Sequence, residues 1–203
     1  MLFEDYPKQL ARQAEQADTE AICRAGELLE RCYRQGRRIW VFGNGGSAAT
    51  ANHFSADFEK NAVPSGMPRP HILSLSESCE KILAYGNDIA FERVFSQQLE
   101  SAAQPGDVVL AISASGNSPN VICGVQSAKK MGVQVIGFTG FSGGELRRLA
   151  DISVHYDVES YELAEDLHAM SCHMLVLFFK QFVCCSEEKR RRKNEQVQVD
   201  RCR

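Results

Sequence analysis

The stretch RIWVFGNGGS, residues 38–47, indicates the fold. Its first half, RIWVF, is a short run rich in apolar and β-branched residues, which is typical of a buried strand. The glycine-rich turn GNGGS follows at once, and residues 48–60 have the composition of a helix. A strand that passes through a glycine turn into a helix is the repeating unit of a parallel α/β sheet. This stretch therefore predicts an α/β domain.

The same alternation continues along the chain. Four further apolar runs predict strands at residues 71–75, 107–112, 133–138 and 152–155. Apolar residues at helical spacing predict helices before the first strand, at residues 5–34, and after the last, at residues 161–183. Strands that are apolar on both faces and alternate with helices favour a parallel sheet covered on both sides. We expect a three-layer α/β/α domain with a five-stranded, flavodoxin-like parallel sheet and an N-terminal helical extension.

Composition divides the chain into three parts. Residues 1–36 are the helical segment, which we expect to pack on the domain or at an oligomer interface, and residues 37–185 are the α/β domain. Residues 186–203 contain the run KRRRK at 189–193 and are predicted to be a basic, disordered tail. Such a run is more often a solvated segment than a binding patch.

Charge and composition exclude several classes of protein. The 203 residues are 44% hydrophobic and carry a formal net charge of -3, so the chain can bury a core but offers no basic surface for nucleic acid. No apolar run approaches the ~20 residues of a membrane helix, and the N-terminus lacks the apolar core of a secretory signal. Eight cysteines without a CxxC pair are better explained as reduced thiols than as disulfides. These observations predict a cytoplasmic protein with no nucleic-acid or membrane partner.

Two loops at the carboxyl ends of predicted strands are suited to bind an anion. One is GNGGS at residues 43–47 and the other is SASGNS at residues 113–118, and each leads into a helix. Ligands of an open parallel sheet bind at this edge, and a helix N-terminus offers free N–H groups and a partial positive charge to a phosphate. Either loop alone would be an ordinary turn, but two at one edge favour a phosphate site. The sequence has no P-loop lysine and no GxGxxG motif, so we expect no nucleotide cofactor.

Five segments taken together resemble a known family. They are VFGNGGSAATANHFSADF at residues 41–58, AYGNDIAFERVFSQQLE at 84–100, PGDVVLAISASGNSPNV at 105–121, GVQVIGFTGFSGGELRRLADISVH at 132–155 and AEDLHAMSCH at 164–173. In this order they resemble the phosphoheptose isomerase branch of the sugar-isomerase (SIS) domain family, from about residue 36 to about residue 179. The SxSGxS pattern marks SIS domains in general, whereas GNGGSAAxxxHF together with the final ExxHxxxxH points to this branch. The resemblance implies a SIS domain at residues 37–185.

The resemblance also implies a substrate site. In the family the SxSGNS loop holds the phosphate of the sugar, the GNGGS loop contacts the sugar, and an Asn-Asp pair and a residue of the last helix face the substrate. The corresponding residues here are Ser113, Ala114, Ser115 and Ser118, then Asn44, Gly45 and Ser47, then Asn87 and Asp88, and finally Glu165. Ala114 stands where the commonest pattern has a hydroxyl, and Glu165 stands where it has Gln.

Catalytic residues and a metal follow from the same resemblance. The proton-transfer pair of the family corresponds to Asp57 and His173, with Asp57 in place of the commoner Glu. Some members bind zinc, and the corresponding ligands are His53, Asp57, Glu165 and His173, so one Zn²⁺ ion per site is the implied cofactor. The residues themselves agree in part, because His53 and Asp57 are four apart on a predicted helix and share a face. A carboxylate with a histidine suits the proton transfers of an aldose–ketose isomerisation.

A homotetramer with shared active sites is the assembly that the family implies, and helix geometry gives a separate reason for sharing. Glu165 and His173 are eight residues apart, or about 12 Å along one straight helix, whereas two zinc ligands must both place donor atoms about 2 Å from the metal. We therefore expect one of the two to join His53 and Asp57 within a chain and the other to come from a neighbour. The alternative is that Glu165 makes a surface ion pair and no metal binds.

Four functions are compatible with these features. The first is isomerisation of sedoheptulose 7-phosphate to D-glycero-D-manno-heptose 7-phosphate through an enediol. The second is a non-catalytic SIS protein that binds a phosphosugar or associates with the replication initiator DnaA. Such relatives lack the catalytic acid and histidine, so Asp57 and His173 favour the enzyme. The others are a sugar-phosphate-sensing module of a regulator and an isomerase or epimerase for a different phosphosugar.

Overall fold

A five-stranded parallel sheet forms the centre of the molecule. The computed structural model describes the backbone of residues 2–201 and the side chains of residues 3–183. The strands, in chain order, are β1 (Arg38–Gly43), β2 (His71–Ser74), β3 (Val108–Ser113), β4 (Gln134–Thr139) and β5 (Ile152–His155). They lie side by side in the order β2-β1-β3-β4-β5, and every pair is parallel. This is the flavodoxin-like strand order, so the predicted fold class is confirmed.

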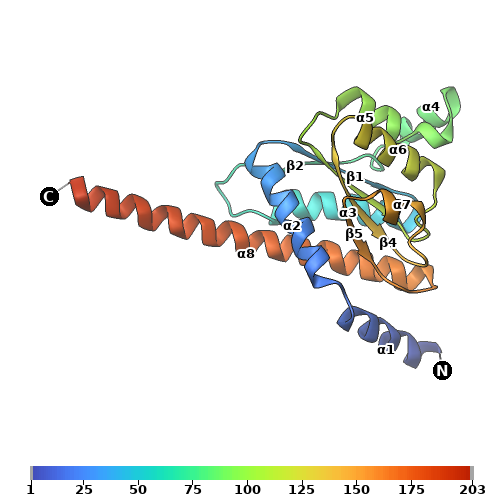
Figure 1. Ribbon diagram of the computed structural model, residues 1–203, viewed down its shortest axis with the longest axis horizontal. Coiled ribbons are helices and arrows are strands. Elements are labelled where there is room, and N and C mark those ends of the chain that lie inside the picture. Colours follow the sequence, from blue (N-terminus) through green and yellow to red (C-terminus); the bar gives the residue numbers. More distant parts are fainter. Residues whose placement is uncertain (1, 202–203) are drawn as a thin grey trace.

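Helices cover both faces of the sheet (Figure 1). One layer holds α2 (Thr19–Arg34), α3 (Gly45–Asn61) and α8 (Tyr161–Arg201). The other holds α4 (Cys79–Asp88), the short 3₁₀ helix η1 (Phe91–Arg93), α5 (Ser96–Ala102), α6 (Pro119–Lys130) and α7 (Gly144–Leu149). The molecule therefore has the three layers that the sequence predicts.

Alternation along β1 divides the core between the two layers. Ile39 and Val41 pack with residues of α2, α3 and α8, whereas Trp40 and Phe42 pack with residues of α5, α6 and α7. None of these four side chains is more than 4% exposed. Because side chains on both faces of the strand are buried, its sequence is a continuous apolar run rather than an alternating one.

The N-terminal extension consists of two helices. α1 (Leu2–Glu15) ends before α2, and the Asp18 side chain caps α2 by accepting a hydrogen bond from the Ala21 N–H at 2.8 Å. α1 packs against α8, where the Tyr6 hydroxyl donates to the Asp166 carboxylate at 2.7 Å. Burial, together with this neighbouring carboxylate, raises the pKa of Tyr6 to about 12. α1 thus packs on the domain, and its place at an oligomer interface stays a prediction.

The last helix, α8, is longer than the predicted range of 161–183. It continues to Arg201 and projects from the rest of the domain in Figure 1. Its first half packs in the core, where Leu167, Leu175 and Phe179 are at most 1% exposed. The side chains beyond residue 183 lie outside the described ones. The expectation of a basic, disordered tail at residues 186–203 therefore stays a prediction.

Two general properties of the described residues bear on the class of protein. No helix among them combines the length and the apolar character that crossing a membrane requires. Five cysteines in this part of the chain are free thiols, namely Cys23, Cys32, Cys79, Cys123 and Cys172.

The carboxyl ends of β1 and β3 meet at one edge of the sheet. Gly43 of β1 lies in register with Ile112 of β3. A Cβ atom on Gly43 would lie 2.7 Å from the Ile112 carbonyl oxygen and 2.7 Å from the Ser47 Cβ, so only glycine permits this close approach. The loops that follow the two strands are therefore held next to each other.

Candidate active site

A small polar cavity of about 120 Å³ lies between the loops that follow β1 and β3. Its walls are formed by Asn44 and Ser47 at the start of α3, Ile112 and Ser113 at the end of β3, Ala114, Ser115 and Ser118 in the loop that follows, and Tyr161 and Glu165 of α8. The structure thus brings together most of the residues that the sequence predicts to bind the substrate. Gly45 lines an adjoining cavity instead.

Serine hydroxyls and two helix ends give this cavity the chemistry of an anion site. The hydroxyl oxygens of Ser113 and Ser118 lie 3.4 Å apart, and the Gly116 N–H donates to the Ser113 hydroxyl at 3.2 Å. Ser118 is the N-cap residue of α6 and Asn44 is that of α3, but neither side chain caps its own helix. The N–H groups at the start of α3 therefore lack this acceptor, and a phosphate is well suited to supply it. The start of α6 offers fewer free donors, because Pro119 has no N–H and the Val121 N–H donates to the Asn120 side chain.

The Glu165 carboxylate lies directly over the start of α3. A Cβ atom on Gly46 would be 2.2 Å from the Glu165 Oε2 atom, so a larger residue at this position would displace the carboxylate. α3 has no acidic residue in its own first turn, and the carboxylate complements the positive end of its dipole. The same carboxylate places a negative charge in the wall of the cavity. Glu165 is therefore better suited to accept hydrogen bonds from sugar hydroxyls than to contact a phosphate.

Three potential metal ligands converge where α3 packs on α8. The Nε2 atoms of His53 and His173 lie 3.1 Å apart, and the ligand atoms of His53, Asp57 and His173 all lie within 4.8 Å of one another. Asp57 also accepts a hydrogen bond from the Asn61 side chain. Both histidines are exposed and Asp57 is half-buried. Two imidazoles and one carboxylate are a donor set that suits zinc and leaves a fourth position for another ligand.

His173, and not Glu165, joins His53 and Asp57 within the chain. Glu165 lies two turns earlier on α8, against Gly46, so it is not part of the group of three. This agrees with the geometric argument that one straight helix does not bring both residues to one metal. The expectation that Glu165 reaches such a site in a neighbouring subunit stays a prediction.

Asn87 and Asp88 are not brought to either group in the chain. They are exposed at the C-terminal end of α4, where the Asn87 side-chain amide donates to the Asp88 carboxylate at 2.8 Å. Neither residue lines the polar cavity. Their assignment to the substrate rests on the resemblance alone and stays a prediction.

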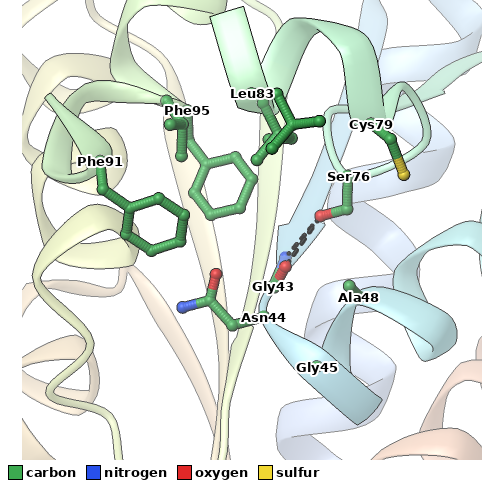
Figure 2. Close-up of a pocket in the computed structure, with 11 residues that line it drawn as sticks. Gly43, Asn44, Gly45, Ala48, Ser76, Cys79, Leu83, Phe91 and Phe95 are labelled. Carbon is green, nitrogen blue, oxygen red and sulfur yellow. Dashed lines mark hydrogen bonds between the residues drawn. The ribbon is translucent and has the colours of Figure 1, made fainter. Parts of the chain in front are cut away.

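A larger and mainly apolar cavity, of about 490 Å³, adjoins the first at Asn44. Figure 2 shows Leu83, Phe91 and Phe95 above the glycine loop that follows β1. The Ser76 hydroxyl accepts a hydrogen bond from the Gly43 N–H at 3.2 Å and donates to the Gly43 carbonyl at 2.8 Å, which ties this loop to the end of β2 (Figure 2). The lining contains no carboxylate and no histidine, so this cavity offers no acid–base pair.

Tyr161 lines the polar cavity, although no motif in the sequence marks it. Its ring packs on Phe141, with ring centroids 4.9 Å apart. Phe141 is the one non-glycine residue among those described that has a positive φ, 46°. A bulky residue in this region is uncommon and is held there by its surroundings. The sequence contains only a weak signal for this pair, namely aromatic residues beside a glycine-rich turn and at the start of a helix.

His168, the middle histidine of the last motif, lies in the core rather than in the site. It is fully buried near the rings of Phe138 and Tyr156, and neither ring nitrogen has a hydrogen-bond partner among the described residues. Burial lowers the pKa of His168 to about 4. The ring is therefore neutral at neutral pH and is part of the hydrophobic core.

Known proteins share both the sequence and the fold. The family model of the SIS domain matches residues 3–140. A probable phosphoheptose isomerase of Thermoplasma acidophilum is 38% identical over 170 residues, which are 84% of this chain and 93% of that protein. A phosphoheptose isomerase of Helicobacter hepaticus is 39% identical over 163 residues, which are 77% of this chain and 80% of that protein. The structure of a phosphoheptose isomerase from Neisseria gonorrhoeae has a TM-score of 0.79 and 30% identity, and the match covers 89% of this chain and 100% of that one.

The doubly wound sheet and the serine loop after β3 define the class of the protein as a phosphosugar-binding SIS domain. The relatives show to which branch of this class the chain belongs. The chain belongs to the SIS-domain family and, within it, to the phosphoheptose isomerases. The resemblance read from the sequence is thereby confirmed.

Proposed function

We propose that this chain is an aldose–ketose isomerase that converts sedoheptulose 7-phosphate into D-glycero-D-manno-heptose 7-phosphate. Relatives named phosphoheptose isomerases support the reaction class. The observation that carries the proposal for this chain is the spacing between the polar cavity and the group formed by His53, Asp57 and His173.

That spacing follows from the way α3 packs on α8. Gly46 of α3 faces Glu165 of α8, and His53 of α3 faces His173 of α8, so the two helices run in the same direction. From position 46 to position 53, α3 rises about 10 Å. The proton-transfer group thus lies about this far from the helix start that lines the polar cavity. In a seven-carbon 7-phosphate, the reacting carbons C1 and C2 are at the opposite end from the phosphate, so a long sugar chain suits this separation.

The proposed reaction consists of two balanced proton transfers. The Asp57 carboxylate takes a proton from C1 of the ketose while protonated His173 gives a proton to O2, and the enediol forms. The enediol then returns the O1 proton to His173, and Asp57 delivers its proton to C2, which gives the aldose. Both side chains end in their starting states, and no external acid, base or oxidant is consumed. A carboxylate and a histidine are the usual groups for such steps.

We also propose that His53, Asp57 and His173 can hold a zinc ion, because the donor set and the mutual distances fit one. A bound zinc would supply Lewis-acid polarisation of an oxygen of the sugar. A histidine nitrogen that binds a metal is deprotonated and cannot donate a proton at the same time. Metal content and turnover therefore have to be measured on the same preparation.

The assembly that we propose is a cytoplasmic homotetramer in which a neighbour completes each site. His53 and His173 are exposed, and Leu177, one turn beyond His173 on α8, is 62% exposed. The family resemblance is the ground for the tetramer, and this exposed stretch of α8 is available to a neighbouring subunit. The free thiols of the described residues agree with a reducing compartment.

The test is to incubate the purified protein with sedoheptulose 7-phosphate and to follow the aldose by ¹³C NMR, with and without added Zn²⁺. We expect conversion that stops at an equilibrium mixture of the two sugars. Binding without conversion under either condition would favour the non-catalytic alternative. A markedly higher kcat/KM on another phosphosugar would assign a different substrate to the same fold.

A further inference from the structure

Two asparagine side chains tie the loop after β1 to the loop after β3. The Asn44 side-chain N–H donates to the Oδ1 atom of Asn120 at 2.8 Å, and the Asn120 side-chain N–H donates to the Oδ1 atom of Asn44 at 2.8 Å. Asn44 is the N-cap residue of α3, and Asn120 lies in the first turn of α6. The two amides therefore form a closed, reciprocal pair across the edge of the sheet at which the polar cavity lies.

Asn120 is the fixed member of this pair. It is 2% exposed, and its side-chain oxygen Oδ1 also accepts a hydrogen bond from the Val121 N–H at 3.0 Å. A buried amide with two such interactions has one orientation, because turning it would leave buried polar atoms unpaired. Asn120 does not line either cavity beside the loop. It is therefore placed to act on a ligand only through its neighbour.

Asn44 is the member that faces the site. It is half-buried and lines both the polar cavity and the apolar cavity of Figure 2. A side-chain amide has two N–H donors and an oxygen with two lone pairs, so the pair leaves Asn44 one donor and one acceptor position. An asparagine at an N-cap usually bonds to its own helix, but this one does not. One N–H and one lone pair of its amide bond to Asn120, and the other N–H and the other lone pair are available to a ligand.

We propose that Asn120 is a positioning residue that fixes the Asn44 amide so that its free N–H and its free lone pair face the hydroxyl groups of the bound sugar. This inference rests on the proposed function, since it takes the polar cavity to be the sugar-phosphate site. Orienting a binding group before the ligand arrives removes an entropic cost from binding. Asn120 thereby acts on the affinity for the sugar without contacting it.

A double-mutant cycle separates this role from a general contribution to the fold. Asn120→Ala, Asn44→Ala and the double variant are compared with the wild type in kcat, KM and the dissociation constant for sedoheptulose 7-phosphate. We expect Asn120→Ala to raise KM and the dissociation constant on the order of fivefold to tenfold, as the loss of a well-placed hydrogen bond does, with a smaller change in kcat. In the Asn44→Ala background, Asn120→Ala should add almost nothing, because its effect passes through Asn44.

The matched control is Trp40→Phe. It removes a buried side-chain hydrogen bond, from the indole N–H to Asp107 at 2.9 Å, at the opposite end of the sheet. This control should lower the melting temperature and leave KM unchanged. If Asn120→Ala does not fold, Asn120→Ser replaces it in the cycle, because a serine hydroxyl is too short to reach Asn44 but still pairs locally.

Two outcomes would overturn the proposal: a variant at position 120 that loses stability as Trp40→Phe does but keeps the wild-type KM, or losses that add in the double variant. Failure of the proposed function is recognised separately. If the wild type binds the sugar phosphate without turning it over, the cycle is run on dissociation constants alone. If it does not bind, ¹⁵N NMR of the Asn44 side-chain NH₂ group still reports on orientation, and unchanged signals in Asn120→Ala would refute it.

Discussion

The Nε2 atoms of His53 and His173 face each other at 3.1 Å, although the residues are 120 positions apart in the chain. Their ring planes lie at 84° to each other. At this distance one nitrogen donates a hydrogen bond to the other, or both bind a cation, since two unprotonated or two protonated nitrogens would repel. Asp57, one turn beyond His53 on α3, adds a carboxylate to this pair, which completes a set of three potential metal ligands.

Metal binding is the first prediction. We expect the purified protein to hold one zinc ion per chain and to lose most of it in His53→Ala, because one of three ligands is removed. The measurement is elemental analysis of the protein after dialysis against metal-free buffer. His71→Ala is the control, since His71 lies at the start of β2, at the other end of the sheet. Equal zinc content in wild type and His53→Ala would place the metal elsewhere.

Turnover is predicted to depend on Asp57 and on His173. Asp57→Asn keeps the shape of the side chain but removes the base, and His173→Ala removes the partner acid. We expect each to lower kcat by roughly a hundredfold or more, as the loss of a general acid or base does. Because His173 is exposed and Asp57 is half-buried, the melting temperature should change little. A variant with a near-normal rate would exclude that residue from proton transfer.

Phosphate affinity is predicted to depend on the serine loop after β3. Ser115→Ala and Ser118→Ala each remove one hydroxyl donor from the polar cavity. A hydrogen bond to a charged group contributes about 1.5–3 kcal/mol, so the dissociation constant should rise by roughly tenfold to a hundredfold. Titration calorimetry with sedoheptulose 7-phosphate measures this change. Ser101→Ala, on the surface of α5, should bind as the wild type does, and unchanged affinity in both loop variants would move the phosphate to another site.

Acid should destabilise the protein through His168. Burial lowers the pKa of this side chain to about 4, below the ordinary value of 6.5, so the unfolded chain binds the extra proton first as the pH falls. The contribution of His168 to the free energy of unfolding is therefore fully present above about pH 6.5. It is lost as the pH falls to about 4, at up to about 1.4 kcal/mol per pH unit. Burial, with Arg147 nearby, also lowers the pKa of His155, which adds a loss in the same direction.

Urea denaturation at pH 5 and at pH 7.5 tests this assignment. His168→Leu should show a smaller loss of unfolding free energy between the two pH values than the wild type. His71→Gln, at an exposed position, should keep the wild-type difference. An unchanged difference in His168→Leu would attribute the acid sensitivity to other groups.

Assembly is the fifth prediction. Leu177 is 62% exposed and follows His173 by one turn of α8, so a contact that covers one covers the other. We expect a tetramer in light scattering, and we expect Leu177→Glu to produce smaller species with reduced turnover. A fully active monomer would contradict both the assembly and the sharing of sites.

Local sequence was sufficient to predict the elements and the loops of this protein, because their signals are local. The strand predicted at residues 38–42 lies in β1, which extends one residue further, to Gly43. The glycine and serine turns lie where ligands bind in such a sheet. Contacts between distant segments were not predictable in this way. Nothing in the sequence near Gly46 indicates that the Glu165 carboxylate will lie against it. Nothing near Asn44 indicates that its side-chain amide will pair with Asn120 instead of capping α3. Both depend on how α8 and α6 pack.

The central claim is that Asp57 carries a proton between C1 and C2 of a seven-carbon ketose phosphate. It is tested most directly by running the wild type and Asp57→Asn on sedoheptulose 7-phosphate in D₂O and recording the product by NMR. The account predicts that the wild type forms the aldose, whose C2 carries either the proton that Asp57 took from C1 or a deuterium that the Asp57 carboxyl exchanged with the solvent, and that folded Asp57→Asn forms almost none. A wild type that forms no aldose with or without zinc, or an Asp57→Asn variant that forms it at the same rate, would contradict the account.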